Sequence, residues 1–245
     1  MPGILLRSPF DEIFLMRLTK KTKLRIRLFL AVPILLLVTV LFQLFPSSSS
    51  DQPPLFHGQP PALKNFNNQL KGLSKTRIKI VKLVESQIGY RTNPVKSYCN
   101  KFSAYWFSGV SDCPNGELDE QWCADFAAWA WRLAGVSFTY QYINGDINSS
   151  SASFYEWGVR FRRWHAKGTG YKPLPGDVAV YGLDRATLIA AHVAVVIGTS
   201  GPKYAPAAVN GDADLKSFSD VEFVTHEIHP DAKYPGVALS GYVSP

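Results

Sequence analysis

The pattern of apolar and polar positions divides the chain into an apolar run, a helical part and a strand-rich part. Residues 28–45 (LFLAVPILLLVTVLFQLF) are an uncharged run of 18 residues. Apolar side chains recur every three to four residues over 76–90 and 121–135, which predicts helices. Strands are then predicted over 177–181, 191–198, 207–210, 221–228 and 238–243. Because helices precede strands, the order favours an α+β domain with an antiparallel sheet over a doubly wound sheet.

The helix predicted over 121–135 carries two apolar stripes. One stripe is bulky and the other is small; their members are Trp122, Phe126, Trp129 and Leu133, and Cys123, Ala127, Ala130 and Ala134. Small side chains allow another element to approach closely. Asp125 and Arg132 are seven residues apart and mark the expected polar side. We therefore expect a central, nearly buried helix with Cys123 at its N-terminal end.

The remaining segments set the expected domain boundaries. Residues 46–75 mix Pro, Ser, Asn and Gln and are typical of a linker, so the folded domain is expected to span 76–245. Residues 91–118 are rich in turn-forming residues, and 154–168 are expected to form a shorter helical or irregular piece. No internal repeat is evident.

Charge is concentrated at the N-terminus. Residues 1–27 hold seven basic and two acidic side chains, so this tail accounts for +5 of the net charge of +7. The remaining 218 residues carry only +2. This distribution argues against a nucleic-acid-binding surface on the domain and draws attention to the apolar run that follows the tail.

The apolar run at 28–45 predicts a transmembrane anchor, because a hydrocarbon core needs about 20 such residues. The basic flank places residues 1–27 in the cytoplasm and residues 46–245 outside the membrane. A cleaved signal peptide is the alternative, although its apolar region is normally 7–15 residues and PSSSS at 46–50 is a poor cleavage site. In both interpretations the domain is exported from the cytoplasm.

Three cysteines in an exported chain leave one unpaired, and three pairings are open. Cys99 and Cys113 lie in the same turn-rich stretch, whereas Cys123 lies on a patterned helix. At a helix N-terminus the unpaired N–H groups and the helix dipole stabilise a thiolate. The alternative is that Cys123 is a small buried hydrophobic residue, as free cysteines often are.

One histidine stands out in the strand region. His192 is the lone polar residue of AAHVAVVIG, and the next predicted strand ends in VNGD, with Asn210 and Asp212 two residues apart on one face. A lone histidine in a strand is usually a core residue with a satisfied partner. Together with Cys123, however, these residues match the nucleophile, base and orienting group of nucleophilic acyl transfer.

Four motifs in order resemble a known family. WCADFAAWAWRLAGV, PLPGDVAVY, AHVAVVIG and VNGD resemble the cysteine, histidine-dependent amidohydrolase/peptidase (CHAP) domain over about residues 76–245. The chain is similar to exported actinobacterial members, which also carry a lead-in such as YCNKFSAYW. The resemblance implies a papain-like α+β fold, with the nucleophile's helix packed on an antiparallel sheet. It also implies cleavage of an amide bond in peptidoglycan or a related peptide.

The resemblance assigns roles to residues of this chain. Cys123 corresponds to the nucleophile and His192 to the general base, later the general acid. The third position falls on Asn210, and Asp212 stands where many members have Asn, so the identity of the residue that orients His192 is open. The turn at 175–177 is structural in this interpretation. The N–H of Cys123 and the side chain of Gln121 are candidate oxyanion donors.

Further expectations follow from this assignment. A nucleophile must remain a thiol in an oxidising compartment, so Cys99 and Cys113 are expected to be bridged. No cofactor or metal is assigned, and a zinc site at His226 and His229 is disfavoured because a spacing of three on a strand puts them on opposite faces. Peptidoglycan is the expected substrate, the membrane is contacted through the N-terminal helix, and no nucleic acid is involved.

Two other functions compete with this one. A catalytically inactive cell-wall binding or scaffold domain on the same fold would not need the intact set of Cys123, His192 and Asn210. A thiol–disulfide exchanger would need the usual CxxC pair, which the sequence lacks. A membrane-tethered, extracytoplasmic cysteine amidase or endopeptidase is therefore the leading hypothesis.

Overall fold

The structure is a computed structural model that describes residues 66–95, 97–109, 113, 117–200, 205–212, 221–224 and 237–245. The predicted cytoplasmic tail, the apolar run at 28–45 and linker residues 46–65 lie outside the described residues, as do His226 and His229. Within the described ranges, no helix combines the length and apolar character that a membrane crossing requires.

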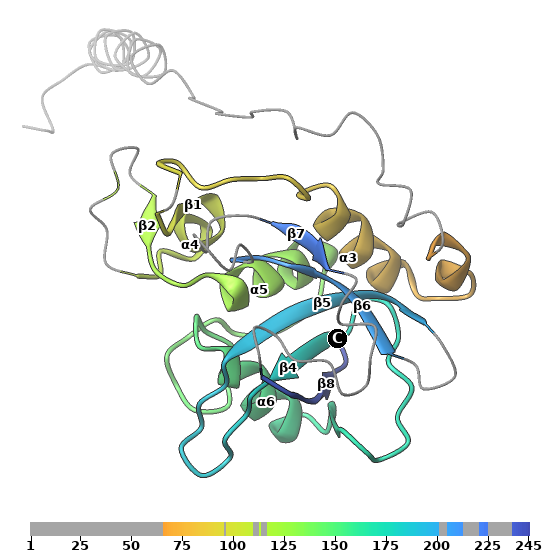
Figure 1. The fold of residues 1–245 in the computed structure, drawn as a ribbon. Helices are drawn as coiled ribbons and strands as arrows, with labels where there is room; N and C mark the ends of the chain where they lie inside the picture. Colours follow the sequence, from red (N-terminus) through yellow and green to blue (C-terminus); the bar gives the residue numbers. More distant parts are fainter. Residues whose placement is uncertain are drawn as a thin grey trace, which may run out of the picture. The chain divides into compact units, whose positions relative to one another are not determined.

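A six-stranded sheet organises the described part of the chain (Figure 1). Its strand order is β3-β8-β4-β5-β6-β7, and every neighbouring pair is antiparallel. The strands are β3 (Trp164–Ala166), β4 (Val178–Tyr181), β5 (His192–Ser200), β6 (Ala205–Asn210), β7 (Glu222–Val224) and β8 (Leu239–Val243). The prediction of a mixed helix-and-sheet fold with an antiparallel sheet is confirmed.

The sheet is buried on both faces, which explains why its strands read as apolar runs. Along β4, Val178 and Val180 pack into the main core with the helices. Ala179 and Tyr181 point to the opposite face and join a smaller apolar cluster. This alternation is the period of two that a strand imposes on its side chains.

The longer helices that pack into the main core beside the sheet are α3 (Lys75–Glu85), α5 (Cys123–Ala134) and α6 (Ser151–Arg160). Helices α3 and α5 lie side by side, and α5 also packs against β5 (Figure 1). Ser74 starts α3 by accepting a hydrogen bond from the backbone N–H of Arg77. Gly135 ends α5 in the left-handed conformation (φ 93°), which favours glycine.

The folded part begins earlier than residue 76, which corrects the expected linker boundary. Phe66 is buried in the main core, and η2 (Asn67–Leu70) follows it. The Gln69 side chain donates to the carbonyl oxygen of Thr199 at 2.7 Å and accepts from its N–H at 2.9 Å. A Cβ at Gly198 would come within 2.1 Å of the Phe66 ring, so β5 leaves room for this segment only because it has glycine there.

The turn-rich stretch at 91–118 contains a short helix that the apolar pattern did not reveal. Helix α4 (Lys101–Trp106) starts at Asn100, whose side chain accepts from the N–H groups of Phe102 and Ser103. Strands β1 (Cys99–Asn100) and β2 (Leu118–Asp119) pair beside it. Cys99 and Cys113 form a disulfide and Cys123 is free, as predicted.

Two local expectations were wrong. The piece expected over 154–168 is divided, because α6 begins at Ser151 and Trp164–Ala166 form β3 against β8. On α5 the expected polar side is not exposed at Asp125, which is fully buried. Leu133, assigned to the bulky buried stripe, is instead 36% exposed, while Trp131 is fully buried.

Candidate active site

Cys123 is the first residue of α5 and lies at the junction of three elements. It is buried, and its Sγ atom lies 3.2 Å from the hydroxyl oxygen of Ser151, the first residue of α6. The sulfur also contacts the backbone of Val193 on β5. The predicted nucleophile therefore stands where α5, α6 and the start of β5 meet.

Burial dominates the electrostatics of Cys123. It raises the pKa of the thiol, whereas hydrogen bonds from Ser151, Val193 and Ala124 act in the opposite direction without cancelling it. The helix N-terminus alone predicted easier thiolate formation, and the structure differs because desolvation outweighs these donors. Thiolate formation at this site consequently depends on a nearby base.

His192 begins β5 and is the residue immediately before Val193. Its Nε2 atom lies 2.9 Å from Oδ1 of Asn210, the last residue of β6. An amide oxygen only accepts, so this bond places a proton on Nε2 and leaves Nδ1 of the neutral ring as the basic nitrogen. Asn210 thereby fixes the tautomer that a general base requires.

Asp212 does not share this role. Strand β6 ends at Asn210, and Asp212 adopts a left-handed backbone conformation with φ 62°. Its Oδ2 atom accepts a hydrogen bond from the backbone N–H of Trp122 at 3.2 Å. Of the two polar residues in VNGD, Asn210 bonds to the imidazole and Asp212 bonds to the residue before Cys123.

Gly211 lies between these two residues and faces α5 closely. A Cβ at this position would lie 2.6 Å from the Cβ of Phe126 on α5. Only a glycine allows the end of β6 to approach the helix this closely. The close contact brings Asn210 and Asp212 to the same end of α5.

Two comparisons relate parts of this chain to known proteins. The family model of the CHAP domain matches residues 115–205, a range that includes Cys123 and His192. This part of the chain is similar to the CHAP domain. No curated protein matches the chain.

One solved structure is similar to this chain. NlpC2 from Trichomonas vaginalis is 13% identical, and the match covers 72% of this chain and 48% of that one, with a TM-score of 0.38. The match thus spans about half the length of NlpC2. A TM-score this low does not support a comparison of the two sites.

Gln121 and Ser151 differ in whether they contact Cys123. Gln121, predicted as an oxyanion donor, is exposed two residues before Cys123. Ser151 was not predicted, because its distance of 28 residues from Cys123 gives no signal in a local pattern. The sequence signal that could have indicated Ser151 is the run of serines at the start of the following helix.

A buried acidic cluster supports the segment that leads into α5. Asp125 accepts hydrogen bonds from the hydroxyls of Ser108 (2.6 Å) and Tyr140. Burial and a hydrogen bond to Asp125 raise the pKa of Glu120 to about 8. This network explains why Asp125 tolerates full burial.

His165 and the 175–177 turn lie away from Cys123. His165 is on β3, separated from β5 by β8 and β4, and its Nε2 atom lies 3.0 Å from the Ser244 hydroxyl. Asp177 bonds to Arg77, Tyr171 and the N–H of Leu174, each at 2.8 Å. These contacts agree with a structural role. Among the described residues no group of His, Cys, Asp and Glu is arranged to hold a metal.

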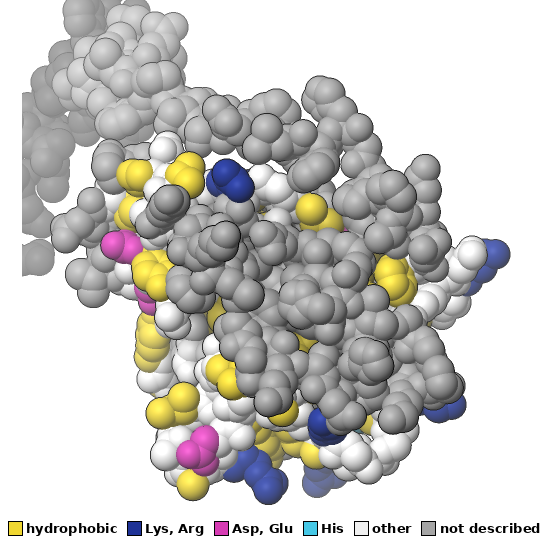
Figure 2. Space-filling model, in the orientation of Figure 1, with side chains coloured by type: hydrophobic (Ala, Val, Ile, Leu, Met, Phe, Trp, Pro, Cys, Tyr) yellow, Lys and Arg dark blue, Asp and Glu magenta, His cyan; other side chains and the backbone are white. Residues whose placement is uncertain are grey.

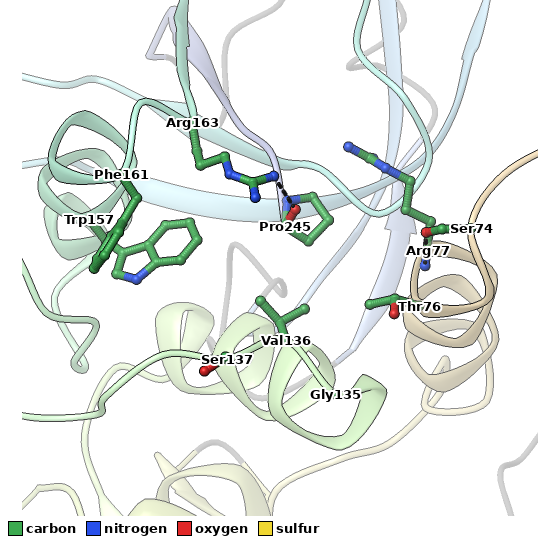
Figure 3. Close-up of a pocket in the computed structure, with 10 residues that line it drawn as sticks. All are labelled: Ser74, Thr76, Arg77, Gly135, Val136, Ser137, Trp157, Phe161, Arg163 and Pro245. Atoms are coloured by element: carbon green, nitrogen blue, oxygen red, sulfur yellow. Dashed lines mark hydrogen bonds between the residues drawn. The ribbon is translucent and has the colours of Figure 1, made fainter.

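A cavity of about 420 Å³ lies at the opposite end of α5 (Figure 3). Trp157 and Phe161 line one side, and the beginning of α3 lines another. Arg77 pairs with Asp177, and Arg163 donates to the carbonyl oxygen of Pro245 at 2.9 Å. Because both guanidinium groups have partners, the cavity does not stand out as an anion site.

Proposed function

We propose that the protein hydrolyses an amide bond of peptidoglycan, with Cys123 as the nucleophile in a papain-like arrangement. The observation that supports the proposal is the spatial arrangement of Cys123, His192 and Asn210. A free cysteine opens a buried helix, His192 begins the strand that touches its sulfur, and Asn210 holds His192 through Nε2. This order of nucleophile, base and orienting group is the one that acyl transfer requires.

In the first half of the reaction, Nδ1 of His192 takes the proton of the Cys123 thiol. The sulfur attacks the carbonyl carbon and forms a C–S bond. The C–N bond then breaks, and the imidazolium returns its proton to the leaving amine. The product at this stage is a thioester on Cys123 and a free amine.

In the second half, a water molecule attacks the thioester carbonyl while His192 accepts its proton. The C–S bond breaks, the acid product leaves, and the proton returns to the sulfur. Backbone N–H groups at the start of α5 are the candidate donors to the oxyanion in both halves. The first bond within α5 runs from the N–H of Phe126 to the carbonyl of Trp122, so the helix offers no acceptor to the N–H of Cys123.

Peptidoglycan is proposed as the substrate because the CHAP domain is a hydrolase-type domain associated with this polymer. The uncharged run at 28–45 and its basic flank support a single-pass anchor, with the catalytic domain outside the membrane. On the face drawn in Figure 2, the visible Lys and Arg side chains are scattered rather than gathered into a stripe. A scattered distribution does not favour a nucleic-acid partner.

Digestion of purified peptidoglycan by the full-length protein tests the activity. We expect mass spectrometry to detect muropeptides with new amine and carboxyl ends. The Cys123→Ala variant should release none while keeping its fold, because alanine fits the small stripe of α5. Release at the same rate by Cys123→Ala, or no release by the wild-type protein, would overturn the proposal.

A reporter fused after Pro245 tests the proposed location. A reporter enzyme that works only outside the cytoplasm should be active when it is fused at this position. Moving seven basic residues of the tail through the bilayer is costly, so the opposite orientation is disfavoured. A reporter that works only in the cytoplasm would contradict the extracytoplasmic assignment.

A further inference from the structure

Asp212 holds an unusual position for an acidic residue beside a nucleophile. Its Oδ2 atom accepts from the backbone N–H of Trp122, whereas its Oδ1 atom is buried and has no hydrogen-bond partner. The whole residue is only 5% exposed. A buried carboxylate with one oxygen left without a donor is energetically unfavourable, which favours the protonated form.

The groups that face Asp212 come from two elements. At the start of α5 they are the Cys123 sulfur and the N–H of Trp122, the residue before the helix, and on β5 the group is His192. Burial and Cys123 raise the pKa of Asp212 to about 8, and the Trp122 N–H and His192 act in the opposite direction. Asp125, the other acid in the first turn of α5, has its carboxyl oxygens bonded to Ser108 and Tyr140.

We propose that Asp212 is a positioning residue that works as a neutral carboxylic acid: it anchors the start of α5 through Oδ2, and its lack of charge permits Cys123 to become a thiolate. This inference rests on the proposed function, in which Cys123 reacts as a thiolate. It assigns to Asp212 a role distinct from that of Asn210, which orients His192.

The physical reason is repulsion between like charges in a buried site. Two anions that share a desolvated space cannot both be stable, as with two carboxylates at one site. When Asp212 is neutral, transfer of the Cys123 proton to His192 gives a thiolate next to an imidazolium. When Asp212 is ionised, its charge pairs with the imidazolium and keeps the proton on the sulfur. The reactive form of the site therefore carries a proton on Asp212.

Asp212→Asn tests this directly, because asparagine has nearly the same shape and is neutral at every pH. The rate of Cys123 alkylation by iodoacetamide is measured in the full-length protein from pH 6 to pH 9. We expect a rise in pH to accelerate alkylation much less in the wild type than in Asp212→Asn. The variant should react about 10-fold faster than the wild type at pH 9, since a neighbouring like charge shifts a pKa by about one unit or more.

Two further variants separate the charge of Asp212 from its anchoring bond. Asp212→Ala also lacks the charge but loses the acceptor for the Trp122 N–H, so it should react more slowly than Asp212→Asn at each pH. Asp119→Asn removes an exposed carboxyl on β2 and should match the wild type. Identical pH profiles for the wild type and Asp212→Asn, or a slower Asp212→Asn at all pH values, would overturn the inference.

A direct measurement covers the case in which a variant does not fold. The side-chain carboxyl of Asp212 in the wild-type protein is titrated by ¹³C NMR and should still be protonated at pH 6. An ionised carboxyl at pH 6 would overturn the inference. Neither alkylation nor NMR needs a substrate, so a protein that shows the expected Asp212 behaviour but releases no muropeptides would refute the proposed function alone.

Discussion

His192 and Asn210 are joined by a hydrogen bond of 2.9 Å between Nε2 and Oδ1 at the ends of two neighbouring strands. Both residues are buried, so water does not replace this bond easily. The bond determines which nitrogen of the ring is free to act as a base. Its loss should therefore affect chemistry more than stability.

Asn210→Ala should lower the rate of amide hydrolysis by about 10²-fold, the size of effect seen when a group that orients a functional histidine is removed. His192→Ala should cost more, because a nucleophile and its base act as one unit. Muropeptide release by the purified variants measures both effects. An Asn210→Ala variant with wild-type rates would show that another residue orients His192.

Ser151→Ala should slow alkylation of Cys123 several-fold at pH 7. The Ser151 hydroxyl lowers the pKa of the thiol, so its removal leaves fewer thiolates at neutral pH. The neighbouring Ser150 is exposed and makes no side-chain cap to α6, so Ser150→Ala is a matched control. Equal rates for the two variants would exclude a role of Ser151 in thiolate formation.

Asp177→Ala should lower the free energy of unfolding by about 3–5 kcal/mol, because it leaves the Arg77 guanidinium without its buried partner. Urea unfolding followed by tryptophan fluorescence measures the change. Asp146→Ala breaks a more exposed pair with Arg160 and should cost less than about 1 kcal/mol. A small loss at Asp177 would mean that water compensates for the missing carboxylate.

Glu120→Gln should change how stability depends on pH. The folded state raises the pKa of Glu120 to about 8 from 4.5, so between these values the folded protein binds the proton more tightly than the unfolded chain does. The contribution of Glu120 to the free energy of unfolding therefore falls as the pH rises from about 4.5 to 8, and it is constant above that range. Thermal unfolding from pH 5 to pH 8 should show a smaller decline in Glu120→Gln than in the wild type, whereas Asp119→Asn should follow the wild type.

The sequence predicted the elements whose apolar period is strong. Helix α5 and the central strands β4, β5 and β6 were expected close to where they occur, because most of their described side chains are buried. Short elements were missed for a physical reason. Helix α4 has only six residues and begins at a cap formed by Asn100, and β3 is a three-residue edge strand stabilised by pairing with β8.

The candidate site was predictable where its residues stand out in a local pattern. His192 is the polar residue of an apolar strand, Cys123 begins the small stripe of α5, and Asn210 and Asp212 lie at and just after the end of β6. Ser151 meets Cys123 through tertiary packing that no local spacing encodes. The burial of Asp125 was missed because it depends on Ser108 and Tyr140, which lie in separate segments.

The contact between Gly211 and Phe126 has a consequence for how a new substrate specificity could arise at the proposed site. At this point the end of β6 approaches α5 so closely that Gly211 contacts the Phe126 side chain directly. A larger residue at 211 would push the strand end and the helix apart. The proposed catalytic residues Cys123 and Asn210 thus lie where this close contact fixes the spacing between α5 and the end of β6. New specificity would have to arise in the surrounding loops, which can vary in length and sequence while this spacing stays the same.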